Sequence, residues 1–175
     1  MIFENSDISL SEIPSADSVE WQRVEPGLKR VKQLNWLLLW LIVIAVWIAL
    51  VLFIDELEDV TTVTLVSIGL ALLSGFHFYA QMKSVAFMAY AVREHDLLYR
   101  SGWLVRTVRV CPFNRVQHCS VSTGIFDRKF GVSSLRMFTA GGNDADVKVQ
   151  GLQLKVANDL RNWIVSKIHK DGAGV

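Results

Sequence analysis

The chain begins with a polar segment, continues with two long apolar runs, and ends with shorter segments in which apolar and polar residues alternate. The apolar runs cover residues 34–54 and 60–80, and neither contains Asp, Glu, Lys or Arg. A helix of this length spans about 30 Å, the thickness of the hydrocarbon core of a bilayer. We therefore predict two transmembrane helices. For the second run, which contains Thr and Ser, a re-entrant or interfacial helix is the alternative.

The acidic link at residues 55–59 is short enough to permit only an antiparallel hairpin, so both outer ends of the pair lie on one side of the membrane. Basic residues flank the pair at these outer ends, and the link contains none. Because Lys and Arg are retained on the cytoplasmic side, we predict a multi-pass protein of the cytoplasmic (inner) membrane with both termini in the cytoplasm. The first helix is expected to be an uncleaved anchor, since no small-residue cleavage site follows it.

Three small residues of the second run, Ser67, Ala71 and Gly75, recur at intervals of four and share one face of the predicted helix. Small side chains let helix backbones approach closely in lipid, where hydrophobic burial does not drive association. We expect this face to pack within the hairpin, and a homo-oligomer interface is the alternative.

The aromatic and titratable residues of the two runs indicate how deep each part of the helices lies in the bilayer. Trp36 and Trp40 are expected in the interfacial belt, and Trp47, near the middle of the bilayer, is expected to pack. His77 is the only residue in either run that titrates near neutral pH. It lies one turn from the cytoplasmic end and has no carboxylate partner in either run, so we expect it to be an interfacial anchor, not part of a proton relay.

The remainder of the chain has the alternation of an antiparallel sheet protein. Turn-forming residues separate the alternating segments, and a four-turn amphipathic pattern at residues 153–168 predicts a closing helix. This combination predicts an α+β membrane protein, in which a helical hairpin precedes an antiparallel β-sandwich or barrel capped by a C-terminal helix. The expected strands are 84–92, 97–103, 104–111, 116–122, 133–139 and 147–150.

The organisation follows in three parts: a cytoplasmic tail and lead-in helix at residues 1–33, the hairpin at 34–80, and a cytoplasmic domain at 81–175. The tail is rich in Ser, Asp and Glu, and its apolar residues Leu10, Ile13, Val19 and Trp21 are a candidate docking strip against the domain. A further helical turn is expected between Gly124 and Gly131, with its apolar side turned inward.

Composition and charge narrow the class of protein. Of the 175 residues, 51% are hydrophobic and 20% charged, below the roughly 25% charge of a typical soluble domain. Residues 81–175 contain twice as many Lys and Arg as Asp and Glu, whereas residues 1–33 are acidic. A basic domain beside the inner leaflet attracts anionic headgroups. The basic residues are dispersed and follow no nucleic-acid-binding motif, so we predict no nucleic-acid partner.

Several short motifs resemble the bacterial pleckstrin-homology domains of YdbS-like membrane proteins, in which a helical hairpin also precedes the domain. The matching segments are Val24-Glu25-Pro26, Pro112-Phe113 with Arg115-Val116-Gln117, residues 124–131 (GIFDRKFG), Ser134-Leu135-Arg136, and Thr139-Ala140-Gly141-Gly142. The resemblance covers about residues 24–168. It implies a seven-stranded, partly open barrel capped by the C-terminal helix, and it implies no catalytic role.

One departure from the wider pleckstrin-homology pattern concerns lipid binding. Phosphoinositide-binding relatives carry several basic residues around their first strand-to-strand turn, whereas residues 93–96 here include two acids. The resemblance therefore transfers no phosphoinositide pocket. The candidate lipid-headgroup contacts are instead Arg106, Arg109, Arg128 and Lys129.

Catalytic, metal and cofactor motifs are not recognised in the sequence. Cys111 and Cys119 are expected on the two strands of one hairpin, too far apart for a disulfide, and are interpreted as free structural thiols. Residues 141–144 (GGND) lack the Lys and the following helix of a phosphate loop and are interpreted as a hairpin turn. We therefore expect no metal and no cofactor.

The sequence favours a non-enzymatic membrane protein whose domain is a protein-interaction or assembly module at the inner leaflet. Its expected partners are membrane lipids and either a homologous membrane protein or further copies of itself. An anionic-lipid or envelope-stress sensor is the alternative, and a membrane-bound enzyme is the weakest of the three hypotheses.

Overall fold

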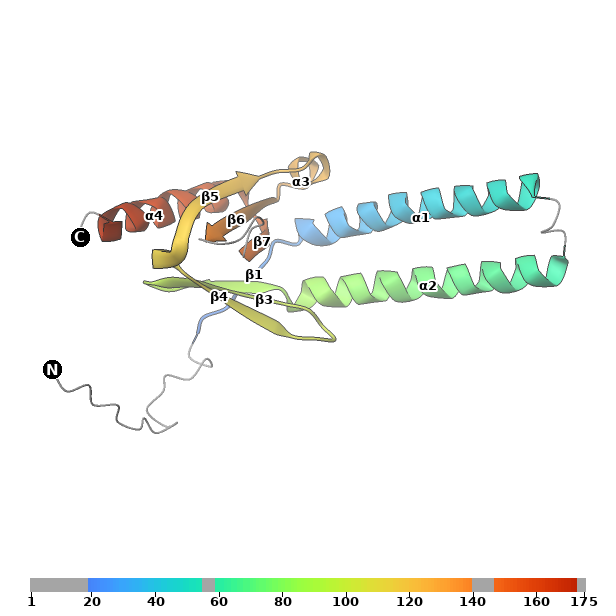
Figure 1. Cartoon of the computed structure of the whole chain (residues 1–175), viewed down its shortest axis with the longest axis horizontal. Helices are drawn as coiled ribbons and strands as arrows, with labels where there is room; N and C mark the ends of the chain where they lie inside the picture. The colour runs from blue at the N-terminus through green and yellow to red at the C-terminus, as the bar shows by residue number, and fades with distance from the viewer. Residues whose placement is uncertain (1–18, 55–58, 140–146, 173–175) are drawn as a thin grey trace, which may run out of the picture.

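The computed structural model describes residues 19–54, 59–139 and 147–172, and it consists of a long helical hairpin joined to a small domain of two sheets and helices (Figure 1). The hairpin is formed by α1 (Gly27–Phe53) and α2 (Val60–Phe87), which lie side by side along their whole length (Figure 1). The domain contains antiparallel sheets and ends with the helix α4 (Leu154–Gly172). This architecture confirms the predicted α+β class.

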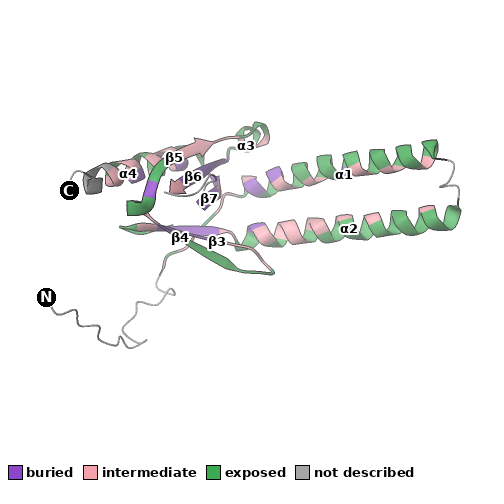
Figure 2. Cartoon of the chain, viewed as in Figure 1, coloured by how far each residue is buried: buried purple, intermediate pink, exposed green. Residues whose placement is uncertain are grey.

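Both long helices expose their apolar side chains. In the most apolar 18-residue window of each helix, 6% of α1 and 0% of α2 is buried, although either helix is long and apolar enough to cross a membrane. Figure 2 shows the exposed residues continuing along both helices, whereas the buried ones gather in the domain. A core helix of a soluble domain would be covered by its neighbours instead.

Helix α2 extends further than the sequence pattern predicted. Residues 84–87, expected to begin a strand, form its last turn, and the strand β2 begins only at Ala89. Val85 is buried in this turn, and adding a turn to an existing helix requires no new nucleation. At its other end α2 is capped by Asp59, whose carboxylate accepts the backbone N–H of Thr62 at 2.9 Å and its hydroxyl at 2.7 Å. Link residues 55–58 lie outside the described residues.

Two antiparallel sheets form the domain. The first contains β1 (Gln22–Arg23), β2 (Ala89–Val92), β3 (Asp96–Ser101) and β4 (Thr107–Pro112), hydrogen-bonded in that order. The second contains β5 (Val116–Ser122), β6 (Ser133–Thr139) and β7 (Val147–Leu152), also in chain order. All six predicted strands are present: β5 and β6 have the predicted ends, the other four have shifted ends, and β1 was not predicted. The predicted turn at residues 141–144 and the tail residues Leu10 and Ile13 lie outside the described residues.

Strand β1 precedes the hairpin in the chain but pairs with β2, which follows it. Gln22 lies opposite Tyr90 and Arg23 opposite Ala89. The two long helices therefore connect neighbouring strands of one sheet, and the range expected for the domain, 81–175, does not contain its first strand.

The chain passes from the first sheet to the second through the 3-10 helix η3 (Phe113–Arg115). β4 pairs with β3 and β5 with β6, so the predicted hairpin that would carry Cys111 and Cys119 is wrong. Phe113 explains the change of direction: its side chain is buried against Trp163 of α4, with ring centroids 5.3 Å apart, and its N–H donates to the His95 carbonyl at 2.9 Å. A hairpin turn would have placed this apolar ring in water.

The core lies between the two sheets and α4. Its fully buried members come from both sheets and from the apolar face of α4, which confirms the amphipathic pattern predicted for that helix. They include Leu97, Leu135, Met137, Val149, Ala157 and Ile164.

A short helix, α3 (Ile125–Lys129), lies between β5 and β6 and contacts α1. The helical turn expected here is confirmed, and the Asp127 carboxylate accepts the Gly124 N–H at 3.0 Å. The expected inward orientation is wrong for Ile125, which is 86% exposed.

The start of α1 is fixed to the domain by close backbone packing. Glu25 donates its N–H to the Gly151 carbonyl at 2.7 Å, and Leu28, in the first turn of α1, is buried. A Cβ atom on Gly27 would lie 2.4 Å from the carbonyl oxygen of Phe130 and 2.9 Å from a methyl group of Val132. This approach leaves no room for any side chain at position 27.

Replacing Gly27 with alanine should therefore lower the free energy of unfolding by about 1–3 kcal/mol, the usual cost of overpacking. The matched control is Gly69→Ala, a helical glycine with no atom within 4 Å of its Cβ position, which should be neutral or stabilising. Urea unfolding of the full chain in detergent, followed by circular dichroism, measures both. Equal effects of the two substitutions would show that the close contact at Gly27 does not affect the free energy of unfolding.

Candidate functional site

Three tryptophans of α1 turn towards α2 and donate their indole N–H groups to it. Trp36 donates to the Ser74 carbonyl, Trp40 to Nδ1 of His77 and Trp47 to the Ser67 hydroxyl, each at 3.1 Å. The Ser67 hydroxyl in turn donates to the Val63 carbonyl at 2.7 Å. These hydrogen bonds determine which side of α1 faces α2. The interfacial position expected for Trp36 and Trp40 stays a prediction, while their indole N–H groups are bonded to the partner helix.

His77 lies at the centre of this contact. Because Nδ1 accepts from Trp40, the neutral ring carries its proton on Nε2, which lies 2.7 Å from the side-chain amide of Gln81. His77 thus has a structural role between the helices, and the interfacial anchoring expected for it stays a prediction.

The predicted small-residue stripe divides between two environments. Ser67 and Ala71 line a groove of about 490 Å³ between the helices, together with Trp40 and Trp47 of α1. Gly75 is exposed, and no atom lies within 4 Å of its Cβ position. Packing within the hairpin therefore involves the first two residues, and a role for Gly75 in an oligomer stays a prediction.

The four candidate lipid contacts do not form one cluster. Arg106 follows the β3–β4 turn, and its guanidinium lies 4.9 Å from the ring centre of Phe87 at the end of α2. Arg128 and Lys129 are exposed on α3, on the α1 side of the domain (Figure 1). Arg109 lies opposite Tyr99 in the register, beside an opening of about 310 Å³ between β4 and the second sheet. Three of the four therefore lie where the helices leave the domain.

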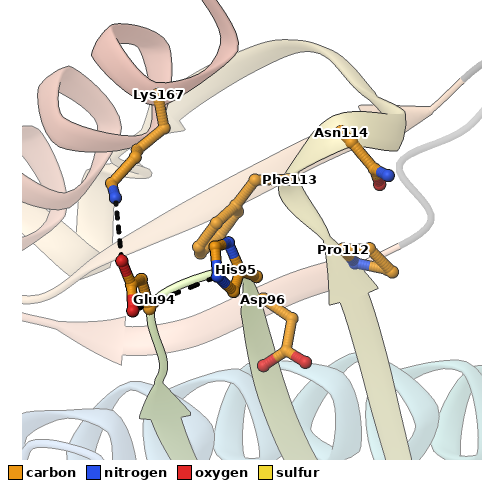
Figure 3. A pocket seen from close by; sticks show the side chains of 7 residues that line it. All are labelled: Glu94, His95, Asp96, Pro112, Phe113, Asn114 and Lys167. Carbon is orange, nitrogen blue, oxygen red and sulfur yellow. Dashed lines mark ion pairs between the residues drawn. The ribbon is translucent and has the colours of Figure 1, made fainter. Parts of the chain in front are cut away.

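The end of the domain farthest from the helices contains a small polar pocket (Figure 3). Its volume is about 230 Å³, and the β2–β3 turn, η3 and α4 line it. Its charges largely neutralise one another: Asp96 accepts from Nε of Arg93 at 2.6 Å, and Glu94 lies 3.9 Å from Lys167. This pocket offers no excess charge for a ligand. The two acids that interrupt the expected phosphoinositide pattern are thus engaged with neighbouring cations.

A model of the bacterial PH domain family matches residues 28–168, which include both long helices and nearly all of the domain. The chain belongs to the bacterial PH domain family. Comparisons with curated proteins and with solved structures gave no match. A closer assignment to the YdbS-like proteins therefore rests on the sequence motifs alone.

Within this PH domain Cys111 and Cys119 form no disulfide with each other, as predicted from the sequence. No group of three His, Cys, Asp or Glu side chains that could hold a metal occurs within residues 19–54, 59–139 and 147–172. Burial between β5 and α4 raises the pKa of the Cys119 thiol to about 11, and the neighbouring Cys111 adds to the effect. A thiol in this state is a poor nucleophile at neutral pH.

Alkylation of Cys119 by iodoacetamide at pH 8 should be about 100-fold slower in the folded PH domain than in the urea-unfolded chain, because its thiolate fraction is that much smaller. Peptide mass spectrometry resolves Cys111 and Cys119 without any substitution. Equal alkylation rates in the folded and unfolded states would contradict the expectation.

Burial also raises the pKa of Tyr90 and Tyr99. The folded chain holds the protons of Cys119, Tyr90 and Tyr99 more tightly than the unfolded chain does. The free energy of unfolding should therefore fall as pH rises above 9.0, the ordinary pKa of a thiol.

The sequence identified Trp21 as a candidate docking residue, but it did not reveal the aromatic contact between the PH domain and α2. Trp21, before β1, does contact the domain: the guanidinium carbon of Arg100 lies 4.7 Å from the centre of its ring. Trp103 packs edge-on against Tyr79 of α2, with ring centroids 5.7 Å apart. The shared helical face of Trp36, Trp40 and Trp47 was readable from their spacing and indicates that all three face α2.

Proposed function

We propose that this protein is a non-enzymatic, membrane-anchored bacterial PH protein whose domain is an interaction or assembly module at the cytoplasmic face of the inner membrane. The exposure of apolar side chains along both faces of α1 and α2 carries the proposal. Residues such as Leu41, Ile48, Leu65 and Leu72 are each more than half exposed, which suits lipid and not water. The basic flanks at Lys29, Arg30 and Lys83 favour a cytoplasmic domain.

Topology reporters test the anchoring. Green fluorescent protein fused to either terminus should fluoresce, and alkaline phosphatase inserted in the link at residues 55–58 should be active. The reciprocal fusions are the control and should be silent. Phosphatase activity at a terminus, or a chain that stays in the aqueous fraction without detergent, would overturn the proposal.

Crosslinking of the full chain in native membranes, followed by mass spectrometry, tests the module. We expect intermolecular links from lysines of the domain such as Lys148 and Lys155, either to a second copy or to a homologous membrane protein. A sample dissolved in sodium dodecyl sulfate before crosslinking is the control and should lose these links. Their absence from native membranes would remove the support for an assembly module.

Recognition of anionic lipid is the second candidate, and the location of Arg106, Arg128 and Lys129 beside the base of the helices favours it. Native mass spectrometry of the full chain should show retained phosphatidylglycerol, which a triple alanine variant at these positions loses. Arg115→Ala, an exposed cation at the opposite end of the domain, is the matched control and should retain it. Equal retention by all three proteins would count against this function.

A further inference from the structure

The turn between β3 and β4 presents apolar side chains at its tip. Gly102 has a φ of +86°, and a Cβ atom there would lie 2.0 Å from the Val105 carbonyl oxygen, so the turn is tight. This geometry leaves Leu104 78% exposed and Val105 74% exposed. Burial of such side chains is worth about 25 cal/mol for each Å² removed from water. Covering Leu104 and Val105 with an apolar surface would therefore be favourable.

Contacts to α2 fix the position of this tip. Trp103 packs edge-on against Tyr79, and Arg106 lies over Phe87. Tyr79 belongs to the apolar part of α2 and is itself 51% exposed, while Lys83 lies over its ring at 5.5 Å. The tip thus lies beside the last apolar turn of α2, where the helix surface changes from apolar to basic.

The short helix α3 presents a similar tip on the other side of the hairpin. Ile125 is 86% exposed, and Arg128 and Lys129 lie exposed one turn further along. Figure 1 shows α3 beside the base of α1 and the β3–β4 turn beside the base of α2, both directed along the helices. Figure 2 shows that both tips are exposed.

We propose that Trp103, Leu104 and Val105 on one side, and Ile125 on the other, insert into the interfacial layer of the bilayer and seat the PH domain on the membrane. The proposal rests on the membrane-spanning role of α1 and α2. A bilayer is the covering surface that meets both tips together, because it surrounds the helix pair at the level of Tyr79. Apolar tips with cations behind them match an inner leaflet, where acyl chains lie beneath anionic headgroups.

Nitroxide labels on single cysteines test the insertion in the full chain, in nanodiscs of phosphatidylethanolamine and phosphatidylglycerol. The background carries Cys111→Ala and Cys119→Ala, and the labels replace Leu104, Ile125, Leu65 and His95. Power saturation compares collisions with oxygen, which partitions into lipid, and with a water-soluble nickel chelate. We expect the labels at 104 and 125 to favour oxygen severalfold over the label at 95, which lies at the far end of the domain, and to be shallower than the label at 65.

Labels at 104 and 125 that match position 95, while position 65 reports lipid, would overturn the insertion and leave the anchoring intact. A label at 65 that also reports water would overturn the anchoring itself. Tips that exclude both reagents would show a protein partner in place of lipid. Should the cysteine-free background misfold, a photoreactive benzoylphenylalanine at position 104 gives the same decision: crosslinks to lipid support insertion, and crosslinks to protein alone overturn it.

Discussion

Replacing Gly151 with alanine should lower the free energy of unfolding of the PH domain by about 2–4 kcal/mol. Gly151 has a φ of +76°, in the left-handed region that an alanine adopts only at a cost of about 1–2 kcal/mol. Its Cβ position also lies 2.9 Å from a methyl carbon of Leu28 and 3.0 Å from Cβ of Val24. Relieving this clash would push the first turn of α1 away from β7.

Gly131→Ala separates the two causes. Gly131 has a φ of +69°, but nothing lies within 4 Å of its Cβ position, so it reports the backbone cost alone, about 1–2 kcal/mol. Urea unfolding in detergent, followed by circular dichroism, measures both variants. If both lost the same stability, the contact between Gly151 and the lead-in to α1 would contribute nothing to holding the helix on the domain.

Replacing Trp40 with alanine should destabilise the helical hairpin by about 2–3 kcal/mol. Trp40 is only 7% exposed, and its N–H group is bonded to Nδ1 of His77. Loss of a buried tryptophan costs about 3–5 kcal/mol in soluble cores, and lipid chains that fill the space reduce this figure. Trp40→Phe keeps a smaller aromatic ring and removes the donor, so it should cost less than Trp40→Ala, and the lost interhelical hydrogen bond accounts for about 1 kcal/mol of the cost.

Unfolding in sodium dodecyl sulfate, followed by tryptophan fluorescence, measures the series. Leu41→Ala is the matched control, because the neighbouring Leu41 is 58% exposed and should change stability by less than about 0.5 kcal/mol. A Trp40→Ala variant as stable as Leu41→Ala would mean that the tryptophan contacts do not hold the hairpin together.

Patterns of period and length predicted most of the fold. Long uncharged runs identified both helices, alternation identified six strands, and a 3.6-residue period identified α4. The failures occur where a segment is too short to show a period. Strand β1 has two residues, and the alternation of residues 84–87 over a single turn does not distinguish a strand from the end of a helix.

Other failures concern direction in space. Residues Pro112-Phe113-Asn114 suit either a hairpin turn or a passage between sheets, and only the burial of Phe113 against α4 decides. For the candidate site, charge alone selected Arg106, Arg128 and Lys129, but it did not reveal that they lie on two sides of the hairpin. Ile125 followed an apolar pattern that predicted burial, and the structure exposes it.

The pairing of β1 with β2 has a consequence for biosynthesis. The ribosome makes β1 first, then both helices, and only then the strand that β1 joins. In a bilayer the two strands meet only if the second helix returns to the side from which the first departed. If the chain crossed the bilayer only once, β1 and β2 would lie on opposite sides of it and could not pair. In the proposed membrane topology, the β1–β2 pair can therefore form only after both helices have inserted with their outer ends on one side.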